Sequence, residues 1–181
     1  MSFTTTCRSP VGTLLLVSDG TALTALHFGD AGAARRLDAS AVADETAAPF
    51  PQARRELAEY FAGRRAAFTI PLAPRGTPFQ ERVWHALRAI PHGATASYGE
   101  IARAVGSPKA VRAVGAANAR NPLAIVVPCH RVIGSDGTLT GYAGGLARKK
   151  ALLALEANRG AGAPGGARRE SRPRRGGHGG G

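Results

Sequence analysis

Residues 97–122 constrain the fold most strongly, because they predict two short helices joined by a tight turn. The segment opens with Ser-x-x-Glu, a capping box in which Ser97 and Glu100 each bind a backbone amide at the start of a helix. Residues 106–108, Gly-Ser-Pro, predict the turn, and residues 109–119 predict a second, alanine-rich helix. This order is typical of a helix-turn-helix, although a plain helical hairpin would show the same pattern.

A longer helix is expected directly before this segment. Thr77 has the side chain of a good N-cap, and Pro78 suits the first helical position. Apolar residues then recur at helical spacing and predict one buried face: Phe79, Val83, Leu87 and Ile90.

A candidate nucleophile follows the helix pair. Residues 123–127 are an apolar run rich in β-branched side chains, which predicts a buried strand ending at Pro128. Cys129 and His130 come next, and a thiol beside an imidazole is a candidate for nucleophilic catalysis. Neighbouring side chains of an extended chain point to opposite faces, so His130 needs a chain turn or a bridging water to take the thiol proton. A small buried thiol and a packed core histidine are the alternative that these residues leave open.

Two further segments complete the second half of the chain. Residues 134–145 form a glycine-rich loop that contains Tyr142 and lacks the Gly-Lys-Ser/Thr ending of a phosphate-binding loop. Residues 146–157 predict a last helix, which carries Glu156 and has Lys149 and Lys150 on its polar side.

The first 74 residues predict a small α/β unit. Alternating apolar residues and turn signals indicate strands within residues 2–28. Residues 51–62 predict a helix, residues 68–70 a further strand, and residues 72–76 a linker with two prolines nearby.

The net charge of +12 is unevenly distributed. It is zero over residues 1–74, +7 over residues 75–158 and +5 over residues 159–181. A basic half beside a neutral half suggests a polyanion such as nucleic acid as the partner, with a merely solvated basic face as the alternative. Residues 159–181 are rich in Arg and Gly and hold no large apolar residue, so we expect them to be disordered.

Several classes of protein are excluded. Two cysteines rule out a disulfide scaffold and a four-cysteine zinc module. Cys7, Asp19 and His27 fit no spacing of metal ligands, so no metal is expected. No apolar run is long enough to span a bilayer, and no signal peptide is evident. We therefore expect a soluble cytoplasmic protein without membrane contact and with reduced thiols.

These motifs together resemble a known family. The sequence PCHRVIG, preceded by RAVGAANARNP and followed by GYAGGLARKKALLALE, is similar to the O6-alkylguanine-DNA alkyltransferases. The resemblance is dense over residues 77–157 and looser over the first 74 residues, through the strand-rich start and SPVG. It implies an α+β fold, with a small ribonuclease H-like domain at residues 1–74 and a mainly helical domain with a helix-turn-helix at residues 75–158.

The resemblance implies a suicide methyltransferase that acts without a cofactor. Cys129 matches the thiol that accepts the alkyl group from O6 of guanine, and O4 of thymine is a further candidate. His130 matches the residue that draws off the thiol proton through a water, and Glu156 matches the carboxylate that orients this histidine. Asn121 matches the hinge between the recognition helix and the active-site turn.

Other positions match residues that contact the substrate or DNA. Tyr98 matches the tyrosine that helps turn out the nucleotide and donates to the guanine ring, and Arg112 matches the arginine that enters the base stack. The resemblance implies a monomer bound in the minor groove of double-stranded DNA that carries O6-alkylguanine. The remaining matched positions are Lys109 and Ala110 near the recognition helix, Tyr142 and Ala143 in the pocket loop, and the carbonyls of Cys129 and Val132 as acceptors for the guanine amino group.

Two departures from the family pattern stand out. Vertebrate members have a serine where this chain has Ala143, so any contact from that hydroxyl is lost. Those members also hold a structural zinc in the N-terminal domain, and this chain lacks the cysteine and histidine pattern for it.

Three other hypotheses have distinct signatures. A lesion-sensing relative of these transferases would lack the acceptor cysteine, whereas Cys129 is present. A cysteine hydrolase would turn over and release product, and it would have no use for a helix-turn-helix. A DNA-coating protein would bind through the basic half and the tail without transferring an alkyl group.

Overall fold

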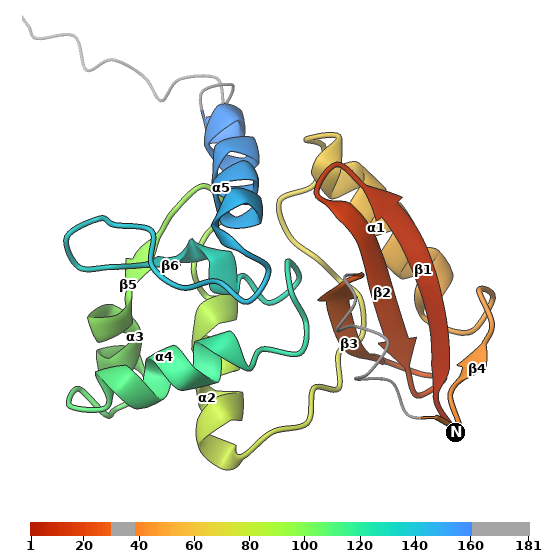
Figure 1. Ribbon diagram of the computed structural model, residues 1–181, viewed down its shortest axis with the longest axis horizontal. Helices are drawn as coiled ribbons and strands as arrows, with labels where there is room; N and C mark the ends of the chain where they lie inside the picture. Colours follow the sequence, from red (N-terminus) through yellow and green to blue (C-terminus); the bar gives the residue numbers. More distant parts are fainter. Residues whose placement is uncertain (30–38, 161–181) are drawn as a thin grey trace, which may run out of the picture.

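The computed structural model describes residues 1–29 and 39–160, and it has the expected α+β fold. A sheet with one helix forms the N-terminal part, and the helices of the second half lie beside it (Figure 1). The expected disordered tail at 159–181 lies outside the described residues from 161 onwards. Among the described residues, no helix is long and apolar enough to cross a membrane.

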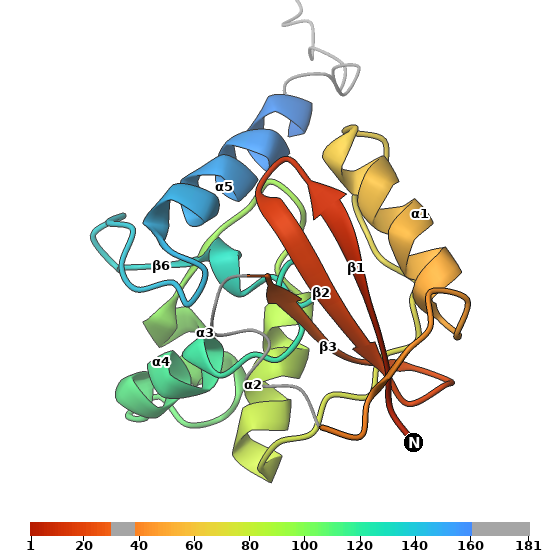
Figure 2. The ribbon, with the colours of Figure 1, turned by 45° about the vertical axis from the view of Figure 1, so that its right-hand side comes forward.

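The N-terminal sheet has the strand order β3-β2-β1-β4. Antiparallel pairing joins β1 to β2 and β2 to β3, whereas β4 runs parallel to β1. Helix α1 lies along this sheet and buries an apolar face against it (Figure 2). The strands and helix of this part are β1 (Phe3–Ser9), β2 (Gly12–Ser18), β3 (Leu23–Phe28), β4 (Val42–Ala43) and α1 (Phe50–Phe61).

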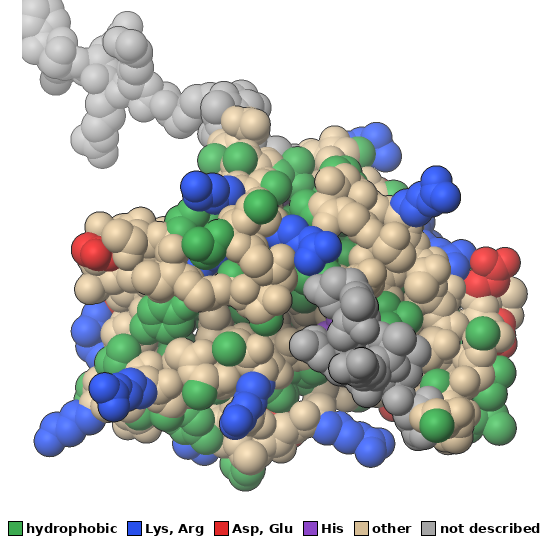
Figure 3. All heavy atoms as spheres, in the orientation of Figure 1, with side chains coloured by type: hydrophobic (Ala, Val, Ile, Leu, Met, Phe, Trp, Pro, Cys, Tyr) green, Lys and Arg blue, Asp and Glu red, His purple; other side chains and the backbone are tan. Residues whose placement is uncertain are grey.

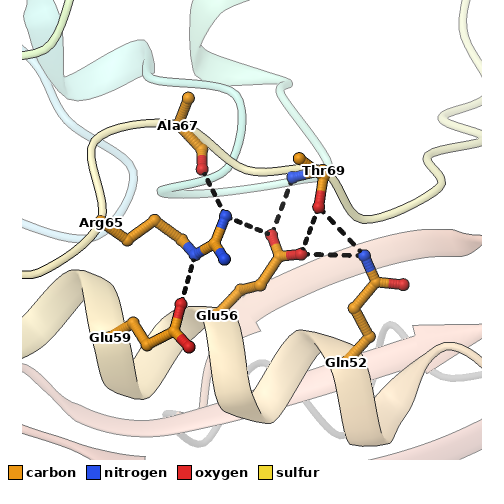
Figure 4. A network of polar contacts seen from close by, with 6 residues as sticks. All are labelled: Gln52, Glu56, Glu59, Arg65, Ala67 and Thr69. Atoms are coloured by element: carbon orange, nitrogen blue, oxygen red, sulfur yellow. Dashed lines mark hydrogen bonds and ion pairs between the residues drawn. The ribbon is translucent and has the colours of Figure 1, made fainter.

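The strand expected at residues 68–70 is absent from the structure. The backbone N–H of Thr69 donates to Glu56 Oε2 at 2.8 Å, and its hydroxyl donates to Glu56 Oε1 at 2.5 Å. Arg65 and Gln52 complete this network, which fastens the segment to α1 (Figure 4). The extended segment thus bonds to side chains of a helix instead of a neighbouring strand, and only Leu72 forms an isolated bridge to the sheet.

The second half contains the expected helix pair. Thr77 and Ser97 both form complete capping boxes, so both predicted helix starts are confirmed. The elements of this half are α2 (Pro78–Arg88), β5 (Ala96–Ser97), α3 (Tyr98–Ala104), α4 (Val111–Ala119), the 3-10 helix η2 (Cys129–Arg131), β6 (Val132–Ile133) and α5 (Leu146–Gly160).

Helix α4 starts two residues later than predicted. The backbone N–H of Ala110 donates to Ser107 O at 2.8 Å, which extends the turn up to Ala110. No side chain caps α4. Lys109 therefore lies in the turn and Ala110 at the N-cap of α4, so the prediction of a helical Lys109 is wrong.

The predicted strand at residues 123–127 is also wrong, although the whole segment is buried. Its amides bond locally, from Val126 to Ala124 O and from Val127 to Leu123 O. Ile125 has a φ of 72°, which no regular strand contains. The segment is a buried, coiled connection, and its apolar composition reflects burial on all sides.

The two halves share one apolar core. Leu26 at the sheet edge exchanges backbone hydrogen bonds with the second half, accepting from Ala124 at 3.0 Å and donating to Pro122 O at 2.8 Å. Arg148 of α5 donates to Val11 O at 2.9 Å and places its guanidinium over the Phe28 ring. These contacts hold the sheet against the helices that carry the candidate nucleophile.

Replacement of Thr77 by alanine tests the cap that starts α2. Thr77→Ala removes the acceptor of the Gln80 amide, and we expect the free energy of unfolding to fall by about 1 kcal/mol. Thr77→Ser, the control, keeps the hydroxyl and should remain close to the parent chain. Urea unfolding, with m-values that do not differ between the variants, measures this loss of stability. Equal stability of Thr77→Ala and Thr77→Ser would contradict the expectation.

Candidate active site

Cys129 lies at the floor of a cavity between the two halves of the molecule. Its residue is 6% exposed, and the cavity has a volume of about 300 Å³. Asn121 and Tyr142 line this cavity from the second half, and His27 and Phe28 line it from the end of β3. The family resemblance implies roles for Asn121 and Tyr142 but none for the two sheet residues.

The backbone turns at the candidate nucleophile. Cys129 begins η2, so Cys129 and His130 do not have the opposed orientation of an extended chain. His130 is fully buried and directs its Nε2 toward Glu156 Oε1 of α5, at 2.8 Å. The predicted alignment of a histidine with a carboxylate is therefore present in the geometry.

Glu156 accepts hydrogen bonds from three side chains on two elements, η2 and α1. Besides His130, the guanidinium of Arg131 reaches both carboxylate oxygens, with Nε 2.8 Å from Oε2 and Nη2 2.9 Å from Oε1. The hydroxyl of Tyr60, on α1, donates to Oε1 at 2.7 Å. These hydrogen bonds and the nearby positive charges outweigh burial and hold the pKa of Glu156 far below its ordinary range.

The same contacts define the tautomer of His130. Glu156 is charged, so Nε2 of the histidine is the nitrogen that donates to it, and the proton-free nitrogen of the neutral ring is Nδ1. Burial lowers the pKa of His130, although the Glu156 carboxylate opposes that shift. The imidazole is thus neutral near neutral pH, and Nδ1, which has no hydrogen-bond partner within residues 1–29 and 39–160, can accept a proton.

The thiol itself is poorly ionised. Burial raises the pKa of Cys129, while the polar groups of Asn121 and Tyr142 and the charge of Lys149 oppose the rise. A thiolate is the reactive form of a cysteine, so this site needs a base to withdraw the proton.

Asn121 fixes the connection between α4 and Cys129. Its Nδ2 donates to Val127 O at 2.8 Å, and its Oδ1 accepts the Leu123 amide at 3.0 Å. Asn118, one turn earlier, donates to Cys129 O at 3.4 Å. The end of the second helix is thereby tied to the segment that carries the nucleophile, and Asn121 is the residue for which the resemblance implies a hinge role.

Lys149 corrects the prediction of a polar outer face on α5. It is fully buried, and its Nζ donates to Val132 O at 2.6 Å and to Thr140 O at 2.9 Å. The ammonium therefore fastens the glycine-rich loop to the strand after η2. The spacing of Lys149, Leu152 and Glu156 along one helical face was a signal of this burial.

The pocket loop packs against the sheet. The rings of Tyr142 and Phe28 meet edge to face with centroids 6.0 Å apart. A Cβ at Gly144 would overlap the Phe28 ring, so this position accommodates only glycine without a shift of one partner. Ala143, which lies between Tyr142 and Gly144 in the chain, lines the same cavity and is exposed.

The other candidate residues are not among those that line the cavity: Val132 is fully buried in β6, and the rest lie on the helix pair or in the turn between its helices. Arg112 is exposed on α4, Lys109 is exposed in the preceding turn, and Ala110 is partly buried. Tyr98 begins α3 and is partly buried against the core, beside Gly115 of α4. Basic side chains are spread over this helical face of the molecule (Figure 3).

No metal-binding arrangement occurs in the part of the chain that the structure describes. There, no three His, Cys, Asp or Glu side chains form a group that could hold a metal ion. Cys7 and His27 belong to different strands of the sheet, and His27 lines the Cys129 cavity instead.

The fold and site define a two-part protein with a buried Cys-His-Glu arrangement beside a helix-turn-helix. Comparisons with known proteins agree. The sequence profile described as "6-O-methylguanine DNA methyltransferase, DNA binding domain" matches residues 78–158, and the profile of the ribonuclease-like domain of the same protein matches residues 3–74. The chain belongs to the 6-O-methylguanine DNA methyltransferase family.

Individual relatives match along most of their length. The methylated-DNA–protein-cysteine methyltransferase of Methanosarcina acetivorans is 51% identical over 149 residues, which cover 82% of this chain and 94% of the relative. The constitutive enzyme of Bacillus subtilis is 46% identical over 154 residues, covering 84% and 93%.

Solved structures of similar proteins show the same fold. The O6-methylguanine methyltransferase of Mycobacterium tuberculosis has a TM-score of 0.79 at 48% identity and covers 91% of this chain and 96% of its own. A structure of the Mycobacterium tuberculosis protein in complex with DNA has a TM-score of 0.81 at 49% identity, covering 87% and 94%.

Replacement of Glu156 tests the buried ion pair. Glu156→Gln leaves the Arg131 guanidinium buried without a counter-charge, so we expect the free energy of unfolding near neutral pH to fall by about 3 kcal/mol. Because the folded-state pKa of Glu156 lies below its ordinary 4.5, this contribution is complete above about pH 4.5 and is lost as the pH falls further.

Urea unfolding at neutral and acid pH checks this expectation. The control is Glu59→Gln, which removes a partly exposed carboxylate paired with Arg65 and should cost less than about 1 kcal/mol. If the free energies of unfolding of the parent chain and Glu156→Gln differ by the same amount at neutral and acid pH, the expected contribution of a charged Glu156 is contradicted.

Proposed function

We propose that this protein repairs DNA by transferring a methyl or other alkyl group from O6 of guanine to Cys129. The observation that carries this proposal is a buried thiol on the floor of a cavity, next to a histidine that burial keeps neutral and that a charged carboxylate orients through Nε2. Family membership supplies the substrate class, because the relatives are named for methylated DNA and a protein cysteine.

The chemistry begins with the thiol proton. His130 accepts this proton at Nδ1 through a bridging water, and Glu156 stabilises the imidazolium that forms. The thiolate sulfur attacks the alkyl carbon, the bond between that carbon and O6 breaks, and its electron pair passes to the guanine. Tyr98 donates a proton to the guanine ring as negative charge develops there. The proton taken from the Cys129 thiol then replaces the proton that Tyr98 has given up.

The cavity has room for a single base, but a base that is stacked within a DNA duplex cannot enter it. Its volume of about 300 Å³ is at the lower end of the range for small-molecule sites, which suits a single purine with a small substituent. A buried thiol cannot reach a stacked base, so the nucleotide must turn out of the helix at a cost of a few kcal/mol.

The helix-turn-helix supplies the surface for this step. We propose that α4 enters the minor groove, that Arg112 fills the gap left in the base stack, and that Lys109 and Ala110 contact the DNA backbone beside it. Minor-groove binding accounts for the small side chains along α4, which allow its backbone a close approach. One chain holds every proposed site residue, which favours action as a monomer.

The cavity walls complete substrate recognition. Tyr142 and Ala143, which line the cavity, are proposed to contact the extruded guanine, and the carbonyls of Cys129 and Val132 to accept from its amino group. Cys129 also lines the cavity, whereas Val132 is fully buried and is not among its lining residues. In the structure Val132 O accepts from Lys149, so the lysine would share or yield this acceptor when a base is bound.

The reaction stops after one transfer. A thioether is chemically stable, because its sulfur has no proton for His130 to withdraw and a thiolate is too poor a leaving group for water to displace from the methyl carbon. Each protein molecule therefore repairs one lesion and needs no cofactor.

Cys129→Ala tests the acceptor. After incubation with a duplex carrying one O6-methylguanine, we expect the intact mass of the parent chain to rise by one methyl group in place of a proton, located on the Cys129 peptide. Cys129→Ala should show no increase, and Cys7→Ala, the control at the second thiol, should behave like the parent. Continued methyl removal by Cys129→Ala would refute the proposal.

Arg112→Ala tests the extrusion step. If the side chain offsets 1–2 kcal/mol of the cost of turning out the nucleotide, its loss should slow repair of duplex DNA by roughly tenfold. Transfer from the free O6-alkylguanine base, which needs no extrusion, should keep its rate. Arg88→Ala removes an exposed arginine from the end of α2 and serves as the charge-matched control. Equal slowing by both variants would indicate a general loss of charge.

A further inference from the structure

Tyr60 reaches the catalytic half from the other part of the molecule. It lies on α1, which packs on the N-terminal sheet, yet its hydroxyl is 2.7 Å from Glu156 Oε1. The two residues are 96 positions apart in the chain, and both are fully buried. The contacted oxygen is also the one that accepts from His130 Nε2 at 2.8 Å.

We propose that Tyr60 is a positioning residue for alkyl transfer, which holds Glu156 in place and limits how strongly this carboxylate attracts a proton onto His130. The inference rests on the proposed function of His130 as proton acceptor. It gives the N-terminal part of the chain an influence on proton transfer, through Glu156, in addition to its packing role.

Competition at one oxygen provides the physical basis. Glu156 Oε1 accepts from Tyr60, His130 and Arg131, whereas a carboxylate oxygen offers about two lone-pair directions. Each donor draws electron density away from the others. The Tyr60 hydroxyl therefore weakens the pull of Glu156 on the imidazolium and keeps the histidine a weaker base, which surrenders its proton more readily.

The Tyr60 hydroxyl is a permanent donor. Burial and the neighbouring Glu156 charge raise the pKa of Tyr60 well above its ordinary value, so the hydroxyl keeps its proton at every physiological pH. Its partner Glu156 is charged over the same range, because its pKa is lowered. This hydrogen bond consequently does not switch with pH, and it shifts the titration of His130 by a constant amount.

The ring of Tyr60 is fixed independently of its hydroxyl. Phe61, Phe68 and His92 surround it, with centroid distances of 5.2, 5.3 and 6.1 Å. Helix α1 is held to the following segment by Glu56 and Thr69 (Figure 4). Tyr60→Phe should therefore keep the packing and remove only the donor.

Other charged groups near His130 remain unchanged in this variant. Arg131 from η2 and Lys149 from α5 lower the pKa of His130, and the Glu156 carboxylate raises it. The thiol of Cys129 and the hydroxyl of Tyr142 lie on the cavity side, and the His92 ring contacts Tyr60 itself. A change in titration on removal of one hydroxyl is thus attributable to the contact between Tyr60 and Glu156.

The test measures single-turnover transfer from an O6-methylguanine duplex as a function of pH. In Tyr60→Phe we expect the acid limb of the profile to move to higher pH by about 0.5–1 unit, with a rate about three- to tenfold lower below that limb. Thr69→Val is the matched control, because it loosens α1 without touching Glu156. Thr69→Val should lower the thermal stability and leave the pH of the acid limb unchanged.

A titration of the histidine side chains by 15N NMR separates this inference from the proposed function. An upward shift of the His130 pKa in Tyr60→Phe is expected whether or not the parent chain accepts a methyl group. Failure of the parent to accept one would refute only the proposed function. An unshifted His130 pKa, or a rate lowered equally at every pH as in a merely destabilised variant, would overturn the positioning role of Tyr60.

Discussion

The packing of the helices around the nucleophile depends on the hydrogen bonds and ion pair of the buried Glu156 carboxylate. This carboxylate joins α5, which carries it, to η2 through His130 and Arg131, and to α1 through Tyr60. Arg131 extends the connection to the end of α2 by donating to Ile90 O at 2.7 Å. A charge without these partners would be costly at such a depth, so the four elements can pack only in an arrangement that supplies them.

Hydrogen bonds tie the helix pair to the segment that carries the nucleophile. Asn118 and Asn121, at the end of α4, bond to the backbone on either side of Pro128. The proposed DNA-contacting face of α4 is therefore held at a set position relative to Cys129. In the proposed reaction, a base that turns out of DNA bound on α4 would meet a cavity whose position relative to α4 these contacts help to set.

Local signals were sufficient for part of this structure. The capping boxes at Thr77 and Ser97 are contained within four residues each, and both helix starts were predictable from them. The segment 123–127 was not predictable in the same way, because a buried coil and a buried strand have the same apolar composition. The contact of Tyr60 with Glu156 arises only when the sheet docks on the helices, so no pattern within the sequence indicates it. The family resemblance, by contrast, singled out Cys129, His130 and Glu156, which the fold brings together.

The close packing of Gly144 against Phe28 has a consequence for how such proteins diverge. The loop around Tyr142 lines one side of the cavity, and the end of β3, which packs against this loop, also lines it. A larger residue on either side requires a smaller one on the other, so the two parts of the chain must change in concert. A chimera that joins the sheet of one relative to the helices of another would combine walls shaped for different neighbours, and its cavity would match neither parent.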